Sequence, residues 1–201
     1  MASLPVHSSA PRNTTLNSTD SHRADVDHQL RTIVDMNESA WSRLRDALDD
    51  VSDAEIDWRP LPQANSINAI VRHLCIEAQW HLDALARGTP MPSEVTPAMR
   101  REIDAVAFDF RRNLTMLEQR VAAFLDTLQS TTAGQLHQRT HAAYGASDAA
   151  AAPHLIAYHQ ALHLTAHCGQ IRMIRNLFRK TRGEPPRFFP DNPTYSPMSL
   201  E

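Results

Sequence analysis

The chain has 201 residues, 42% of them hydrophobic and 21% charged, with a formal net charge of −3, and this length suits one domain with a sizeable core and additional tails. The negative charge argues against a nucleic-acid partner, and the lack of any apolar run of about 18 residues argues against a membrane partner. Two cysteines are too few for a disulfide framework, so a cytoplasmic location is expected.

Residues 1–24 come first along the chain and are rich in Ser, Thr and Asn. They contain neither the apolar segment of a secretion signal nor the Arg-rich amphipathic pattern of a transit peptide. A segment this polar cannot bury enough apolar surface to offset the entropy that ordering costs. We therefore predict a disordered N-terminal arm over residues 1–24.

Four segments then repeat apolar residues at helical spacing, and each predicts a long helix. The helices are expected from about Asp25 to Leu48, from a cap at Asn65 or Ser66 to Arg87, from after Pro97 to about Leu128, and from about Ala149 to Lys180. The connectors at residues 52–59 and 132–139 share a [Ser/Thr]-x-x-[Glu/Gln] start, which is typical of a capping box before a short helical turn. Two such helix pairs predict an all-α domain over residues 25–180, folded as a four-helix bundle.

The C-terminal segment, residues 181–201, holds five prolines. Proline removes a backbone donor and fixes φ, so the segment forms neither a helix nor a central strand. Phe188, Phe189 and Tyr195 provide apolar side chains. We expect this tail to pack along the bundle.

A row of histidines marks the last predicted helix, where "YHQALHLTAHCGQ" places His159, His163 and His167 four residues apart. Positions at this spacing differ by about 40° around a helix axis, so the imidazoles form one stripe. Buried imidazoles need partners for both ring nitrogens, and two histidines at this spacing can chelate a divalent cation. We favour a metal site over core histidines bonded to neighbours or a stripe that faces solvent. No Glu follows His159 or His163, so the metalloprotease motif is absent.

A third metal ligand has to come from another helix, and the second helix offers His73 and His81. His81 lies inside the apolar stripe of that helix, whereas His73 lies at its flank, about 60° from Ile70. Periodicity alone therefore slightly favours His81.

The segments "NSINAIVRHL" and "HLTAHCGQI" together resemble the DinB-like (DinB/YfiT) superfamily of metal-dependent proteins, and the resemblance covers roughly residues 25–180. In that family a His of the second helix joins two His of a His-x-x-x-His-x-Gly-Gln stretch. By position, the resemblance implies that His73, His163 and His167 hold a divalent metal, commonly zinc or nickel, and that His159 lines the pocket. It also implies an up-down-down-up bundle and a homodimer.

The resemblance carries functional expectations as well. Some members of the superfamily use a low-molecular-weight thiol, so our leading hypothesis is a metal-dependent enzyme, such as a thiol transferase, that acts on an electrophilic small molecule. A hydrolase, or a non-catalytic metal-binding or stress-linked bundle protein, is the alternative. Further candidates near the metal are Glu77 and Gln170 as catalytic groups, and His81, Trp80 and Tyr144 as pocket or supporting residues.

Overall fold

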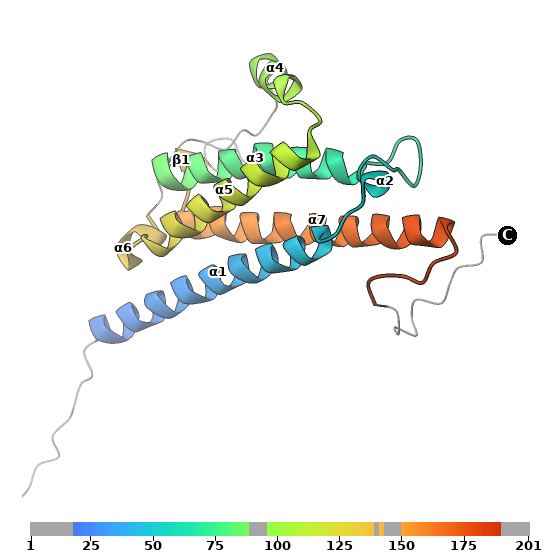
Figure 1. The fold of residues 1–201 in the computed structure, drawn as a ribbon. Coiled ribbons are helices and arrows are strands. Elements are labelled where there is room, and N and C mark those ends of the chain that lie inside the picture. The colour runs from blue at the N-terminus through green and yellow to red at the C-terminus, as the bar shows by residue number, and fades with distance from the viewer. Residues whose placement is uncertain (1–17, 89–95, 139–140, 143–149, 190–201) are drawn as a thin grey trace, which may run out of the picture.

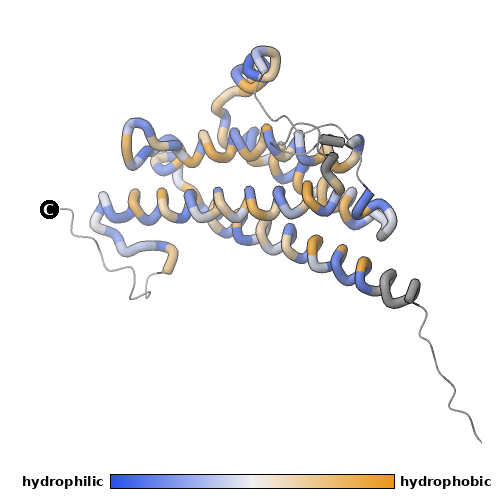
Figure 2. The backbone as a smooth tube through the Cα atoms, turned by 180° about the vertical axis from the view of Figure 1, so that it is seen from behind, coloured by the Kyte–Doolittle hydropathy of each residue, from blue (hydrophilic) through white to orange (hydrophobic). Residues whose placement is uncertain are grey.

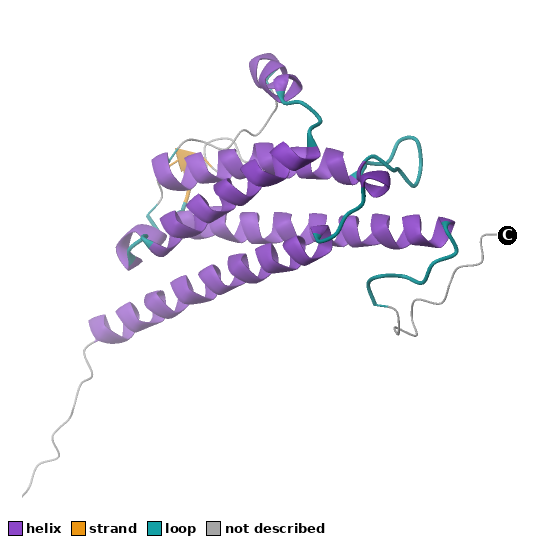
Figure 3. Ribbon diagram, in the orientation of Figure 1, coloured by secondary structure: helices purple, strands orange, loops and turns teal. Residues whose placement is uncertain are grey.

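The structure is a computed structural model that describes residues 18–88, 96–138, 141–142 and 150–189, and it confirms the all-α fold (Figures 1 and 3). Four long helices form the bundle: α1 (Ser18–Leu48), α3 (Ile67–Arg87), α5 (Phe110–Gln129) and α7 (Pro153–Thr181). Shorter helices are α2 (Asp53–Ile56), α4 (Pro97–Ala105) and α6 (Ala133–Leu136). A two-residue antiparallel pair, β1 (His141–Ala142) with β2 (Ala150–Ala151), precedes α7.

The long helices form two pairs, and the two helices of each pair run parallel to each other. The first pair is α1 and α7. Asn37 of α1 donates to the carbonyl of Ala157 on α7, and further along both helices Arg175 donates to the carbonyl of Ala47. Figure 1 shows α3 and α5 running together in the opposite direction. The directions along the chain are therefore up, down, down and up.

Apolar side chains close the space between the helices. Hydrophilic and hydrophobic stretches alternate along the coloured parts of the long helices (Figure 2), as is typical of amphipathic helices. The larger core cluster contains buried residues of α1, α3, α5 and α7, including Leu44, Ile70, Leu117, Leu164 and Ile171. A smaller cluster around Phe124 joins α1, α3, α5, α6 and α7. These two clusters fix α3 and α7 against the rest of the bundle, and α3 and α7 carry the predicted metal ligands.

The predicted boundaries of α3 are confirmed, because local signals set them. Ser66 caps the start, where its Oγ accepts from the amide of Ala69 at 3.2 Å. Gly88 ends the helix in the left-handed region, at φ 63°, which glycine adopts without steric cost.

The prediction of one helix from Pro97 to about Leu128 is wrong. The chain forms α4 and α5 with a break at residues 106–109. Arg72 of α3 donates from Nε to the carbonyl of Val106 at 2.7 Å and also bonds the carbonyl of Ile103, so a side chain from another helix satisfies the end of α4. Asp109 then caps α5 by accepting from the amide of Arg112 at 3.0 Å.

Two other helix starts differ from the prediction. α1 begins at Ser18 rather than about Asp25, so residues 18–24 of the predicted arm are helical, and residues 1–17 lie outside the described part of the chain. α7 begins at Pro153 rather than about Ala149. Proline suits the first helical position because its missing amide proton has no partner there in any case.

Both predicted short helical turns are confirmed. In α2 the amide of Ser52 donates to Glu55 Oε2 at 2.9 Å, and in α6 the amide of Thr132 donates to Gln135 Oε1 at 3.0 Å. The same capping chemistry therefore follows α1 and α5.

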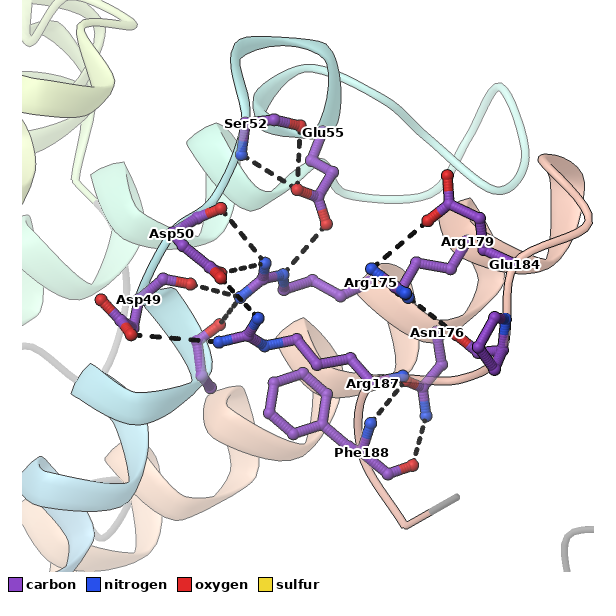
Figure 4. Close-up of polar contacts among 12 residues, drawn as sticks. Asp49, Asp50, Ser52, Glu55, Arg175, Asn176, Arg179, Glu184, Arg187 and Phe188 are labelled. Carbon is purple, nitrogen blue, oxygen red and sulfur yellow. Dashed lines mark hydrogen bonds and ion pairs between the residues drawn. The ribbon is translucent and has the colours of Figure 1, made fainter.

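The described part of the C-terminal tail runs back along the bundle. Asn176 Oδ1 accepts from the amides of Arg187 and Phe188, both at 3.0 Å, and the Phe188 ring packs against the larger core cluster (Figure 4). Residues 190–201, including Tyr195, lie outside the described residues. Among the described helices, none combines the length and apolarity that crossing a membrane requires.

Candidate metal centre

Two rows of polar side chains face each other across the interface of α3 and α7. Each row uses every fourth residue, so its members share one face of the helix. The rows are His73, Glu77 and His81 on α3, and His159, His163 and His167 on α7. The two helices are antiparallel, so His73 lies against His163 and His167, while His81 lies against His159.

Three of these imidazoles converge. His163 Nε2 lies 3.0 Å from His73 Nε2 and 3.0 Å from His167 Nε2. Within the described residues, His73, His163 and His167 form the one group of three or more potential ligands whose donor atoms all lie within 4.8 Å of one another. The structure thus brings together the three residues that the family resemblance implied.

The donor set fits a divalent metal. Three imidazole nitrogens bound to zinc at tetrahedral angles, each about 2.0–2.1 Å from the ion, lie roughly 3.3 Å apart. The observed separations of 3.0 Å for two of the pairs are close to that spacing. A proton on His163 Nε2 can point to only one of its two neighbours, so hydrogen bonding alone does not satisfy the cluster.

Gln170 sets the tautomer of His167. Its Oε1 accepts from His167 Nδ1 at 2.9 Å, which places the proton of the neutral ring on Nδ1. His167 Nε2 therefore presents a lone pair to the centre of the cluster. Metal-binding histidines are commonly oriented in this way by a hydrogen bond to the second ring nitrogen.

The protein holds these rings in the neutral form that a metal requires. Burial lowers the pKa of His73 and His167 below the ordinary histidine value, and His73 reinforces the shift at His167 by charge repulsion. Burial, followed by repulsion from the surrounding histidines, lowers the pKa of His163 further. The His73 side chain nevertheless keeps 43% of its surface exposed and that of His163 keeps 14%, so the cluster opens to solvent on one side.

Glu77 adds a carboxylate to the same place. Its Oε1 lies 3.5 Å from His73 Nε2, and its Oε2 lies 3.4 Å from His163 Nε2. The side chain is 14% exposed. The carboxylate therefore lies against two of the three converging nitrogens.

His81 is not part of the converging group, so the slight preference that periodicity gave it is wrong. Its ring is fully buried, Nδ1 donates to the carbonyl of Glu77 at 2.8 Å, and Nε2 accepts from His159 Nδ1 at 2.7 Å. Both nitrogens are thus used within the protein. Helical periodicity identifies the residue of one helix that is most deeply buried. A metal ligand instead has to reach the point at which side chains of two helices converge.

The remaining candidates are placed as follows. Trp80 is partly buried against the smaller core cluster. Tyr144 lies outside the described residues. The hydrogen bond between His81 and His159 was not predicted. The available signal was the spacing of eight residues between His73 and His81, which places these two histidines on one face of α3.

The metal-free protein is expected to lose stability as the pH falls from about 6.5 towards 4. Burial lowers the pKa of His81 to about 4, below that of an unfolded chain, so the unfolded state binds more protons in this window and acid favours unfolding. For His81 alone the loss is on the order of 3 kcal/mol by pH 4. Urea unfolding with chelator present, at several pH values, measures it.

A His81→Asn variant is the control, because Asn keeps a donor for the carbonyl of Glu77 but does not titrate. Its free energy of unfolding should change less between pH 6.5 and 5 than that of the parent. Asp50 and Glu55 act at lower pH, since hydrogen bonds lower the pKa of both carboxyl groups. Equal pH slopes in parent and variant would contradict the prediction.

Comparison with known proteins gives one match. The family described as the DinB superfamily matches residues 36–166, about two thirds of the chain. The matched range includes His73, Glu77 and His163 and ends just before His167. Neither the curated proteins nor the solved structures gave a significant match.

Proposed function

This chain belongs to the DinB superfamily, and from that premise we propose that it is a divalent-metal-dependent enzyme that acts on a small molecule. The observation that carries the proposal is the convergence of three neutral imidazoles with one side open to solvent. Structural zinc sites surround the ion with four protein ligands, whereas catalytic sites keep a position for water or substrate. The half-exposed His73 supports the second kind of site.

His73, His163 and His167 would hold the metal, with zinc or nickel as the proposed ions. When bound, the ion supplies Lewis acidity that lowers the pKa of a coordinated thiol or water and polarises an electrophile. Gln170 keeps the lone pair of His167 directed at the ion. Histidine ligands are neutral, so they leave the positive charge of the ion available to an anionic substrate group.

A low-molecular-weight thiol is the substrate class that we propose. Its sulfur would attack an electrophilic small molecule and form a new carbon–sulfur bond, with release of the thiol proton and of any leaving group on the electrophile. A neutral three-histidine ligand set favours the thiolate, which is the nucleophilic form of a thiol. His159 would line the same pocket, because its ring stacks on that of His163 with centroids 5.8 Å apart. We also propose a homodimer, which light scattering after gel filtration would test.

The test is a panel of thiols and electrophiles with the zinc- and nickel-loaded protein. Thiol consumption should depend on the metal and should disappear in a His163→Ala variant that stays folded by circular dichroism. A His137→Ala variant is the matched control, because His137 is exposed and contacts Gln29 of α1 and the ring of His154. Metal binding without any turnover across the panel would favour a non-catalytic metal-binding protein.

A further inference from the structure

We propose that the outer face of α1 and α7 binds a second copy of this chain, with the two copies related by a two-fold axis. This inference rests on the homodimer proposed above, and it assigns the contact surface and the orientation of the partner. Among the described residues, seven large hydrophobic side chains are exposed. Four of them lie on the outer face of α1 and α7, namely Met36 on α1 and Leu155, Leu162 and Met173 on α7.

The exposed apolar and small residues of α7 form one narrow stripe. The stripe consists of Leu155, Leu162, Ala166, Gly169 and Met173. At 100° and 1.5 Å per residue, these positions fall within an arc of about 60° and extend over about 27 Å of the helix. The buried side of an amphipathic helix carries such a stripe, whereas the solvent side is normally polar. A second apolar stripe on the exposed side therefore indicates a protein interface.

Gly169 supports a close approach by another helix. Glycine destabilises a helix interior relative to alanine. A Cβ added at Gly169 would meet nothing within 4 Å outside its own part of the helix, so packing within the chain does not require glycine at this position. A partner backbone that lies close against the stripe would require it.

The spacing along the stripe is the same in both directions. Leu162 and Ala166 are four residues apart at its centre. Leu155 lies seven residues before the first of them, and Met173 lies seven residues after the second. A second α7 that runs antiparallel therefore places the partner's Met173 against Leu155. It also places the partner's Ala166 against Leu162, so that a large side chain meets a small one. A surface that complements itself in this way suits a two-fold dimer.

Charges on α1 fit the same axis. A groove of about 380 Å³ lies between α1 and α7, which run side by side (Figure 1). Asp35 and Arg43 both line it, one four residues before Ser39 and the other four residues after it. Neither side chain forms an ion pair within the part of the chain that the structure describes. Reversal about Ser39 would bring Asp35 of each copy to Arg43 of the other, which gives two ion pairs.

The two patterns share one centre. Ser39 lines the groove together with Leu162 and Thr165, which lie on either side of the midpoint of the α7 stripe. The midpoints of the α1 and α7 patterns thus lie at the same level of the bundle. A single two-fold axis at this level pairs α7 with the partner's α7 and α1 with the partner's α1.

This arrangement leaves the metal centre accessible. His163 and His167 lie about 80° and 120° around α7 from Leu155, on the side that faces α3. Ala161 and Thr165, which line the groove, lie on the opposite side of the stripe, towards α1. A partner on the α1 side therefore borders the open side of the metal centre without filling it.

A Leu162→Glu variant of the full chain is expected to dimerise at least about ten-fold more weakly than the parent, because it buries a charge at the centre of the interface. Leu61→Glu is the matched control, since Leu61 is 65% exposed, as Leu162 is at 64%, but lies in the loop before α3. Sedimentation equilibrium measures the dissociation constant, and circular dichroism checks that each variant is folded. Should Leu162→Glu fail to fold, the charge variants below carry the test.

Charge reversal tests the ion pairs. Asp35→Arg and Arg43→Asp should each weaken the dimer, because like charges then face each other across the axis. The variant with both substitutions should recover most of the parent affinity. Losses that simply add in the double variant would overturn the proposed pairing.

A cross-link tests the position of the axis. A Ser39→Cys variant should form a disulfide with its counterpart when treated with copper phenanthroline, whereas Glu118→Cys, at an exposed site on α5, should not. The natural cysteines are both buried and serve as the background. A dimer in which Ser39→Cys does not cross-link, or in which Leu162→Glu behaves like Leu61→Glu, overturns this surface alone. A parent protein that is monomeric at every concentration overturns the homodimer as well, while its zinc content tests the metal centre independently.

Discussion

A His163→Ala variant is expected to bind zinc or nickel about three orders of magnitude more weakly than the parent protein. His163 Nε2 lies within 3.0 Å of both His73 Nε2 and His167 Nε2, so its removal leaves two imidazoles with no ligand between them. Metal content after gel filtration against a competing chelator measures the loss. His73→Ala and His167→Ala should lose affinity in the same way.

The folded state should survive this loss. The two core clusters contain none of the three proposed metal ligands, His73, His163 and His167. Removal of the metal by a chelator should therefore lower the melting temperature only modestly. His81→Asn is the control for metal content, because both ring nitrogens of His81 are used within the protein, and it should keep its metal. Full metal occupancy in His163→Ala would contradict the assignment of the three histidines as metal ligands.

An Arg175→Ala variant is expected to be destabilised by about 3–5 kcal/mol, which is the usual effect of removing one partner of a buried ion pair. Arg175 is 2% exposed and donates from Nε to Glu55 Oε1 at 3.0 Å, while Glu55 is 6% exposed (Figure 4). The guanidinium also donates to the carbonyl of Asp49 at 2.7 Å and to Asp50 Oδ1 at 2.8 Å. Removal leaves a buried carboxylate and several backbone carbonyls without these bonds. Urea unfolding followed by circular dichroism measures the change.

Three further variants sharpen this prediction. Arg175→Lys keeps the charge but loses the planar fork, so its destabilisation should be smaller but still clear. Adding Glu55→Gln to Arg175→Ala should recover part of the loss, since it removes the buried charge. Arg179→Ala is the surface control, because its pair with Glu184 is partly exposed and should contribute below about 1 kcal/mol. A loss for Arg175→Ala as small as that for Arg179→Ala would contradict the buried-pair argument.

Acid should weaken the same network. Hydrogen bonds from Arg175 contribute to lowering the pKa of Asp50, and bonds from Ser52 and Arg175 outweigh burial in lowering that of Glu55. Their stabilisation is complete above the unfolded carboxyl pKa and is lost as the pH falls through the folded values. Asp50 also sits in the left-handed region, at φ 52°, where Arg175 and Arg187 hold it.

Local chemistry was sufficient for several features of this chain. Ser66 and Gly88 marked the ends of α3, and the capping boxes at Ser52 and Thr132 marked the two short helices, because each signal acts within one turn of the backbone. Helical periodicity also placed His163 and His167 on one face. These inferences need no knowledge of what packs against the helix.

Packing between distant segments decided the rest. Arg72 ends α4 from another helix, which no pattern within residues 97–128 could indicate. The choice of His73 over His81, and the place of Glu77 beside it, depend on how deeply each turn of α3 sits against α7. Arg175 joins segments more than a hundred residues apart in the chain. Contacts of this kind depend on how whole helices are placed relative to one another. Burial of the shared core determines that placement, and the pattern of residues within one helix does not reveal it.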